Sequence, residues 1–219
     1  MIKPTTLDFL SQVTRNNNRE WFLANKDAYE TAKQDIHELT GKIIPVLARI
    51  DPRFQADADP KKCLLRIYRD IRFSKDKTPY KTNFGISFSV GGKGVNEPGY
   101  FLQLEPGKSF LAGGSWMPEA AHLKLIRQEI DYNGSEFRGL VESPGFRKYF
   151  ELSREDTLKT TPKGYDADHP EIEYLKLKSF VGIHDIADKS LFDPKFVDKL
   201  GKAFENLYPL VVFLRNALA

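Results

Sequence analysis

The sequence predicts a single-domain α+β fold in which a mainly antiparallel sheet is packed by helices from both ends of the chain. Apolar residues recur at helical spacing up to about residue 50, alternate with polar residues at a period of two within residues 62–112, and return to helical spacing near the C-terminus. Strands linked this closely leave no room for crossover helices, so we expect an antiparallel meander.

The composition is that of an ordinary globular protein. The 219 residues include 33 Lys and Arg against 30 Asp and Glu, a net charge of +3, and 41% are hydrophobic. A chain of this length buries roughly 70% of its unfolded surface, enough for a core without disulfides or metals. There is no apolar run near the roughly 20 residues that cross a bilayer, no apolar signal core at the N-terminus, and a single cysteine, Cys63. We therefore expect a soluble, cytoplasmic protein with no membrane partner.

The first fifty residues predict helices with a break at Asn16–Asn18. Asn18 is expected to cap the second helix, because its side-chain oxygen can accept a backbone amide, and Trp21 and Phe22 then enter the core. The apolar stripe continues at Ile36, Leu39, Ile43 and Leu47. Pro45 interrupts this stripe and predicts a kink or break, since it lacks an amide donor.

The next part of the chain predicts strands. Alternation indicates strands at Cys63–Tyr68 and Phe84–Val90, followed by shorter ones at Tyr100–Leu104 and Ser109–Ala112. Glu105–Lys108 separates the last two and contains a Pro-Gly turn signal. On the apolar face of its strand, Cys63 is expected to be a small buried side chain rather than a nucleophile.

Helices return after the meander. Pro118 suits the first turn of a helix that reaches about Tyr132, and residues 143–170 predict loop with short pieces. Leu177–His184 predicts a last strand, and the C-terminal apolar stripe predicts a long helix with a kink at Pro209.

Positive charge is concentrated in one stretch. Residues 61–81 contain eight basic and two acidic residues, a net charge of 8 − 2 = +6 against +3 for the whole chain. The basic residues are Lys61, Lys62, Arg66, Arg69, Arg72, Lys75, Lys77 and Lys81. Such a patch can pair with phosphate or carboxylate, whereas the alternative is a solvated face paired internally with Asp70, Asp76 and other acids. Residues 66–83 are called the basic segment below.

One arginine in the basic segment is out of pattern. If the strand continues, Arg69 lies on the face of Leu65, Ile67, Ile71 and Phe73, and an unpaired buried guanidinium is very unfavourable. Arg69 must therefore be paired or lie beyond the sheet, and Asp70, Asp76 or Glu105 could be its partner.

Residues 74–83 form a loop too long and too charged for a minimal hairpin turn, and such loops often carry function. Its lysines, Lys75, Lys77 and Lys81, would supply point charges. Tyr80 could stack or donate a hydrogen bond, and Asp76 could orient a lysine or act as a base. The structural alternative is that Pro79 and Asp76 fix the turn while Tyr80 packs on the sheet.

The basic segment resembles the signature of a family of conserved hypothetical proteins known as domain of unknown function 2461. Further stretches with the same resemblance are Asn17–Phe22, Gly113–Pro118, Thr161–Tyr165 and Asp168–Pro170. The resemblance extends from about Leu7 to Leu214, which implies one domain. It implies no reaction, cofactor or catalytic residue.

Two glycine-rich stretches are candidates for phosphate binding. Gly113 and Gly114 precede the predicted helix near Pro118, so their amides could form an anion-binding nest; the alternative is a tight turn from strand to helix. Gly91–Gly94 lacks the spacing of a P-loop and is expected to be a connection.

Among the histidines, His169 is the candidate for acid–base chemistry, because Asp168 beside it could orient its imidazole. The alternative is a helix cap, with Pro170 at the first helical position and Glu171 in the first turn. No HExxH motif or Cys/His cluster occurs, so no metal site is expected.

Three functions remain open. The favoured one is a binding site for an anionic, phosphorylated ligand; its residues would be Arg66, Arg69, Arg72, Lys75, Lys77, Tyr80, Lys81, Gly113 and Gly114. Nucleic acid is a further ligand class, with weaker support because the global charge is modest. The second is a hydrolase-type enzyme in which Asp70, Asp76 or His169 transfers protons while arginines stabilise charge. The third is a structural or interaction domain whose basic strand is paired internally. No cofactor is identified.

Overall fold

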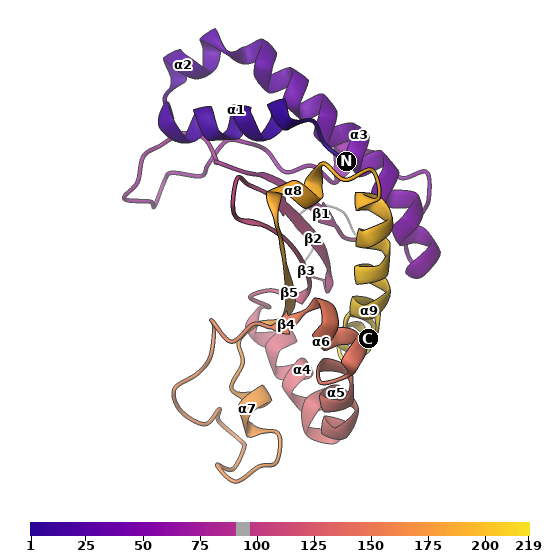
Figure 1. Cartoon of the computed structure of the whole chain (residues 1–219). Coiled ribbons are helices and arrows are strands. Elements are labelled where there is room, and N and C mark those ends of the chain that lie inside the picture. The colour runs from indigo at the N-terminus through magenta and orange to yellow at the C-terminus, as the bar shows by residue number, and fades with distance from the viewer. Residues whose placement is uncertain (91–96) are drawn as a thin grey trace. The chain divides into compact units, whose positions relative to one another are not determined.

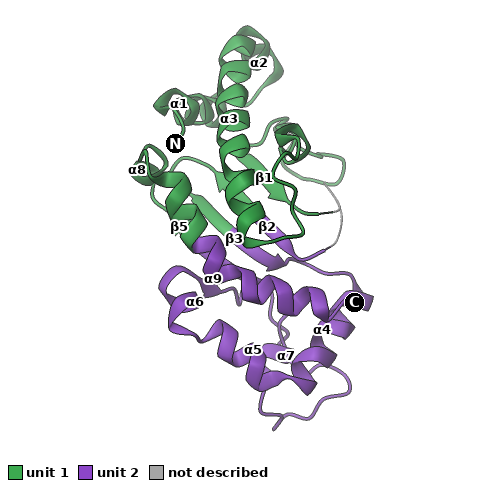
Figure 2. Ribbon diagram, turned by 90° about the vertical axis from the view of Figure 1, so that its right-hand side faces the viewer, with its two compact units in different colours: residues 1–93, 101–111, 185–202 green, residues 94–100, 112–184, 203–219 purple. Residues whose placement is uncertain are grey.

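A computed structural model describes residues 1–90 and 97–219 of the chain (Figure 1). The Gly91–Gly94 stretch lies outside the described residues. Contacts divide the chain into two compact units (Figure 2). Unit 1 contains residues 1–93, 101–111 and 185–202, and unit 2 contains residues 94–100, 112–184 and 203–219. The single-domain organisation stays a prediction.

The helices of unit 1 follow the predicted pattern. They are α1 (Pro4–Arg15), α2 (Arg19–Ala24), α3 (Lys26–Ile50), α8 (Asp188–Leu191) and the first part of α9 (Phe196–Asn216). The break at Asn16–Asn18 is confirmed, and the Asn18 side-chain oxygen accepts a 2.9 Å hydrogen bond from the Trp21 amide. Phe22 is buried as predicted, whereas Trp21 is half-buried.

Helix α3 does not end at Pro45, because Ile44 and Leu47 are buried on either side of it and hold the helix in place. Helix α1 lies against α3 (Figure 1). The buried Asp35 carboxylate of α3 accepts hydrogen bonds from the Lys3 amide at 2.8 Å and the Thr6 hydroxyl at 2.5 Å. These bonds satisfy two donors at the start of α1.

An antiparallel sheet confirms the α+β class. Its strands are β1 (Phe84–Phe88), β2 (Gly99–Leu104), β3 (Ser109–Ser115), β4 (Glu151–Leu152) and β5 (Phe180–Ile186). The order β1-β2-β3-β5-β4 confirms the predicted meander over the first three strands. The turn between β2 and β3 has Gly107 at φ +71° and a 3.0 Å bond from the Lys108 amide to the Glu105 carbonyl. Strands β2, β3 and β5 each contribute residues to both units.

The predicted strand at Cys63–Tyr68 is wrong. After a 3₁₀ turn, η1 (Pro60–Lys62), the chain makes two bonds with β1: the Leu65 amide donates to Gly85 and the Ser87 amide donates to Cys63, both at 2.9 Å. It then leaves β1 and pairs with residues 79–81 through an isolated bridge between Tyr68 and Tyr80. A change of partner within a few residues prevents a regular ladder. Cys63 is accordingly half-buried rather than buried.

Helices α4 (Ala120–Tyr132), α5 (Gly134–Val141), α6 (Pro144–Tyr149) and α7 (Ile172–Leu175) belong to unit 2. Helix α4 ends at Tyr132 as predicted but begins two residues after Pro118, and β5 begins at Phe180 rather than Leu177. Helix α9 continues through Pro209. In unit 2, α4 contacts both α5 and α7 (Figure 2), and Phe137 is fully buried at the centre of rings from Tyr174, Phe180 and Phe213.

Candidate functional site

The basic segment has little regular structure and is anchored by Tyr80. The Tyr80 ring is only 4% exposed and stacks on Phe22, with ring centroids 3.9 Å apart and planes 10° from parallel. The Asn17 side chain accepts a 3.0 Å bond from the Tyr80 amide and donates a 2.9 Å bond to its carbonyl. The Tyr80 ring therefore belongs to the core of unit 1 and stacks on a ring of helix α2, whereas the structural alternative placed it on the sheet.

Arg69 is paired, as its place in the sequence requires. Its Nη1 lies 2.6 Å from the Asp76 carboxylate and donates to the Thr78 carbonyl at 3.1 Å and to the Thr78 hydroxyl. The Thr78 amide also donates to Asp76, and this bond, with those from the Thr78 hydroxyl and Arg69, lowers the pKa of Asp76. Asp76 is thus an ionised carboxylate that closes the loop, which is a poor arrangement for a general base.

Arg72 and Asp70 form a second internal pair. The carboxylate accepts bonds from Arg72 Nη2 at 2.6 Å and Nε at 2.9 Å, and this bidentate contact lowers the pKa of Asp70 to about 2. Both side chains are exposed to solvent. The Lys77 ammonium donates to the Ile71 carbonyl at 3.0 Å, so it holds the backbone of the same loop.

Four cations of the basic segment form no ion pair within the part of the chain that the structure describes: Arg66, Lys75, Lys77 and Lys81. Lys81 is partly buried, and its pKa is lowered first by burial and then by the positive charge of Arg66. These two cations repel one another and add to the positive potential of the basic segment. An anionic ligand would relieve this repulsion.

Two aromatic rings of the basic segment face solvent. Phe73 is 95% exposed and Tyr68 is 53% exposed, and the Arg72 guanidinium lies 5.7 Å from the centre of the Phe73 ring. The prediction that Phe73 shares an apolar face with Ile67 is wrong, because residues 69–79 form no strand and Phe73 is exposed. Sequence reasoning therefore missed an exposed ring among cations.

His169 is paired with a different carboxylate from the one predicted. Its Nε2 lies 2.9 Å from Asp131 Oδ1 on α4, and its Nδ1 accepts a 3.0 Å bond from the Glu171 amide, while Asp168 is exposed. The imidazole therefore binds the backbone just before α7, close to the capping alternative, although Pro170 precedes the helix instead of starting it. His169 is in unit 2, whereas Asp70 and Asp76 are in unit 1.

A surface pocket of about 430 Å³ lies beside α4 in unit 2. Its lining residues are Ala120, Leu123, Lys124, Arg127, Gln128, Asp131, Lys163, Gly164 and Tyr165. Arg127 is half-buried, and its guanidinium donates to the Leu175 carbonyl at 2.7 Å and the Leu177 carbonyl at 3.1 Å. A single arginine on a helix gives no sequence signal, so sequence reasoning missed Arg127. The one feature of the sequence that pointed to this pocket was the motif-like stretch Thr161–Tyr165, three residues of which line it.

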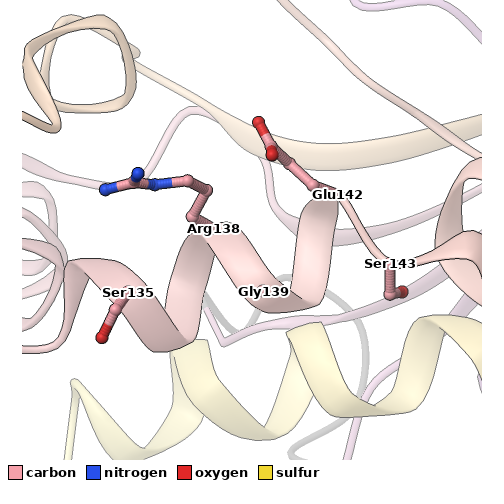
Figure 3. Close-up of a pocket in the computed structure, with 5 residues that line it drawn as sticks. All are labelled: Ser135, Arg138, Gly139, Glu142 and Ser143. Atoms are coloured by element: carbon pink, nitrogen blue, oxygen red, sulfur yellow. The ribbon is translucent and has the colours of Figure 1, made fainter.

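A second pocket, of about 310 Å³, is formed along α5 (Figure 3). Figure 3 shows that its labelled side chains do not converge, since Arg138 and Glu142 project from one side of the helix and Ser135 from the other. Arg138 is paired with the buried Glu171, and Glu142 accepts a 2.9 Å bond from the Tyr174 hydroxyl. The polar groups of this pocket therefore hold unit 2 together.

The structure places Gly113 and Gly114 inside β3, before the turn that leads to α4. A Cβ at Gly113 would overlap the Leu207 side chain, and one at Gly114 would overlap the Phe180 carbonyl oxygen. Gly114 also has a φ of +129°, which glycine adopts readily. Their small size is required by packing in unit 2, and neither the expected turn nor a nest lies at these residues.

No group of three His, Cys, Asp or Glu side chains within residues 1–90 and 97–219 is arranged to hold a metal ion. No described helix is both long and apolar enough to cross a membrane. The expected cytoplasmic location stays a prediction.

Comparisons with known proteins give a family and no function. A family model described as "Conserved hypothetical protein (DUF2461)" matches residues 5–213. No curated protein matches the chain, and no solved structure matches it.

Proposed function

Because the chain belongs to the DUF2461 family of conserved hypothetical proteins, whose description names no reaction, we propose a function from its own geometry: the basic segment binds single-stranded nucleic acid. The observation that carries this proposal is Phe73, a ring that is 95% exposed beside Arg72 in a loop rich in unpaired cations. Proteins that bind single strands combine cations for the phosphates with aromatic rings on which bases stack.

The cations of the basic segment are available for phosphates. Arg66, Lys75 and Lys81 have no ion pair among the described residues, and the Arg72 pair with Asp70 is exposed. Exposed ion pairs contribute about 0–1 kcal/mol, so Arg72 can exchange Asp70 for a phosphate at little cost. Arg69, in contrast, is only 25% exposed and is held by Asp76 and Thr78.

The ligand class follows from the shape of the segment. An exposed loop with rings and spaced cations suits an extended chain of phosphates and bases better than a small phosphorylated molecule. Unstacked bases have free π-faces, which a duplex does not offer. The modest net charge of the whole chain is no obstacle, because the excess positive charge is local.

The test is fluorescence anisotropy with a labelled oligothymidylate at several salt concentrations. Phe73→Ala should weaken binding about five- to 150-fold, because stacking contributes about 1–3 kcal/mol per base. Replacing Arg66 and Lys75 together by alanine should reduce the slope of log affinity against log salt by about 1.4, or about 0.7 for each lost phosphate contact.

Matched controls are available in unit 1. Leu23→Ala removes another exposed apolar side chain, and Lys108→Ala removes an exposed lysine outside the basic segment; both should bind like the wild type. Absence of binding at low salt, or wild-type affinity of Phe73→Ala, would rule the proposal out.

The internal pairs of Arg69 and Arg72 favour a second candidate, in which the basic segment only stabilises the fold. In that case neither the wild type nor the variants of Phe73, Arg66 and Lys75 would bind the oligothymidylate. The enzyme alternative has no support among the described residues. Asp70 and Asp76 each hold an arginine, and both ring nitrogens of His169 are engaged, one by Asp131 and the other by the Glu171 amide.

A further inference from the structure

The pocket beside α4 contains an arginine with unused donors. A guanidinium has five N–H donors, and two of those of Arg127 are taken by the carbonyls of Leu175 and Leu177. No described carboxylate forms an ion pair with Arg127. The two carbonyl bonds fix the plane of the guanidinium and leave three donors for a ligand.

The lining of this pocket is positive. Lys124 and Lys163 are exposed at its surface and form no ion pair with any residue that the structure describes. The only acid in the lining, Asp131, is engaged by His169 at 2.9 Å. Three cations therefore face a pocket whose single carboxylate already has a partner.

Tyr165 and Leu123 provide the apolar part of the lining. The Tyr165 hydroxyl is neutral at physiological pH, and burial raises its pKa further above that range. A volume of about 430 Å³ lies within the roughly 300–1,000 Å³ typical of small-molecule sites.

We propose that this pocket binds a small phosphate monoester, with the phosphate on Arg127, Lys124 and Lys163 and its organic group against Tyr165. A phosphate monoester carries about −1.5 to −2 charges at neutral pH, which matches three cations better than a monocarboxylate does. The fixed guanidinium offers the planar geometry that binds two phosphate oxygens at once. The proposal is independent of nucleic-acid binding by the basic segment.

Isothermal titration calorimetry with phenyl phosphate tests the site, with benzoate and phenol as matched probes. Phenyl phosphate should bind saturably, benzoate at least tenfold more weakly, and phenol without saturation. Replacing Lys124 and Lys163 together by alanine should raise the Kd for phenyl phosphate at least tenfold. Both lysines are exposed, so the thermal midpoint of the unliganded protein should not change.

Arg127→Lys keeps the positive charge but removes the planar guanidinium. It should therefore weaken the binding of phenyl phosphate even where the fold is retained. Lys159→Ala, which removes an exposed lysine outside the pocket, and Phe73→Ala should leave the Kd at the wild-type value. The proposal is overturned by no saturation at millimolar phenyl phosphate, by benzoate binding as tightly, or by an unchanged Kd in the double lysine variant. Loss of phenyl phosphate binding in Phe73→Ala would also overturn it, by moving the site to the basic segment.

Discussion

Tyr80 joins the basic segment to the helices of its unit through both its ring and its backbone. The ring stacks on Phe22, and the two backbone polar groups are bound by the Asn17 side chain, 63 residues earlier in the chain. A side chain held on all sides in this way contributes to stability whether or not the loop binds a ligand.

We therefore expect Tyr80→Ala to reduce the free energy of unfolding by about 3–5 kcal/mol, the range for large aromatic side chains removed from a core. Tyr80→Phe keeps the stacked ring and should reduce it far less. Urea unfolding monitored by circular dichroism measures both. Wild-type stability of Tyr80→Ala would show that the ring does not belong to the core.

Asp70 gives a pH dependence with a defined sign. Its bond to Arg72 lowers its pKa in the folded state to about 2, below the ordinary value of 3.8. A lowered pKa means that the ionised group stabilises the fold above about pH 4, and that this contribution is lost as the pH falls toward 2.

The wild type should therefore be slightly more stable than Asp70→Asn at neutral pH, and this advantage should shrink through the acidic range. It should also shrink in high salt, because both partners are exposed. Urea midpoints of the two proteins across the acidic range measure it. A difference that does not vary with pH would contradict the assignment.

At the scale of the elements, the residue types that β3 can contain are restricted by the atoms that pack on it. Gly114 combines a positive φ with a backbone carbonyl at the position of its missing Cβ, whereas Gly107 in the β2–β3 turn has a positive φ but open space around it. A comparison of the two positions therefore separates the effect of backbone strain on stability from that of steric overlap.

Gly114→Ala should reduce the free energy of unfolding by about 2–6 kcal/mol, from strain and overpacking of about 1–3 kcal/mol each. Gly107→Ala should reduce it by only about 1–2 kcal/mol, from strain alone. Chemical denaturation of both variants measures the difference, and equal losses would show that Gly114 tolerates a side chain.

Local patterns predicted the elements whose causes are local. The Asn18 cap, the meander and the C-terminal helix each follow from residues within a few positions of one another. The absence of a regular strand at residues 63–68 was not predictable in this way, because it depends on which segments lie alongside.

At the candidate site, too, contacts between residues close in the sequence were predictable and contacts between distant residues were not. Arg69 was expected to have a partner, and Asp76 seven residues away supplies it. In contrast, the partner of His169 lies 38 residues away on α4, and Arg127 is held by carbonyls about 50 residues away. Contacts at such separations leave no pattern in a single sequence.

At the scale of the whole molecule, the two units are interleaved along the chain. Each consists of three separate stretches, and strands β2, β3 and β5 supply residues to both. Unfolding of either unit would therefore break strands that continue into the other.

We expect a single cooperative transition on heating, with equal calorimetric and van't Hoff enthalpies. Differential scanning calorimetry measures both quantities. Two separate transitions would show that the units unfold independently and would contradict the single-domain organisation.

The interleaving also determines when each unit can form during synthesis. In unit 1, the Ile2 amide donates to the Leu191 carbonyl, and the Gly107 amide donates to the Asp188 carboxylate, both at 3.0 Å. The ribosome makes residues 112–184 between these partners, which takes roughly 4–15 seconds at ordinary rates of translation. Unit 2 in turn waits for residues 203–219, so neither unit can be completed on the ribosome much before the other.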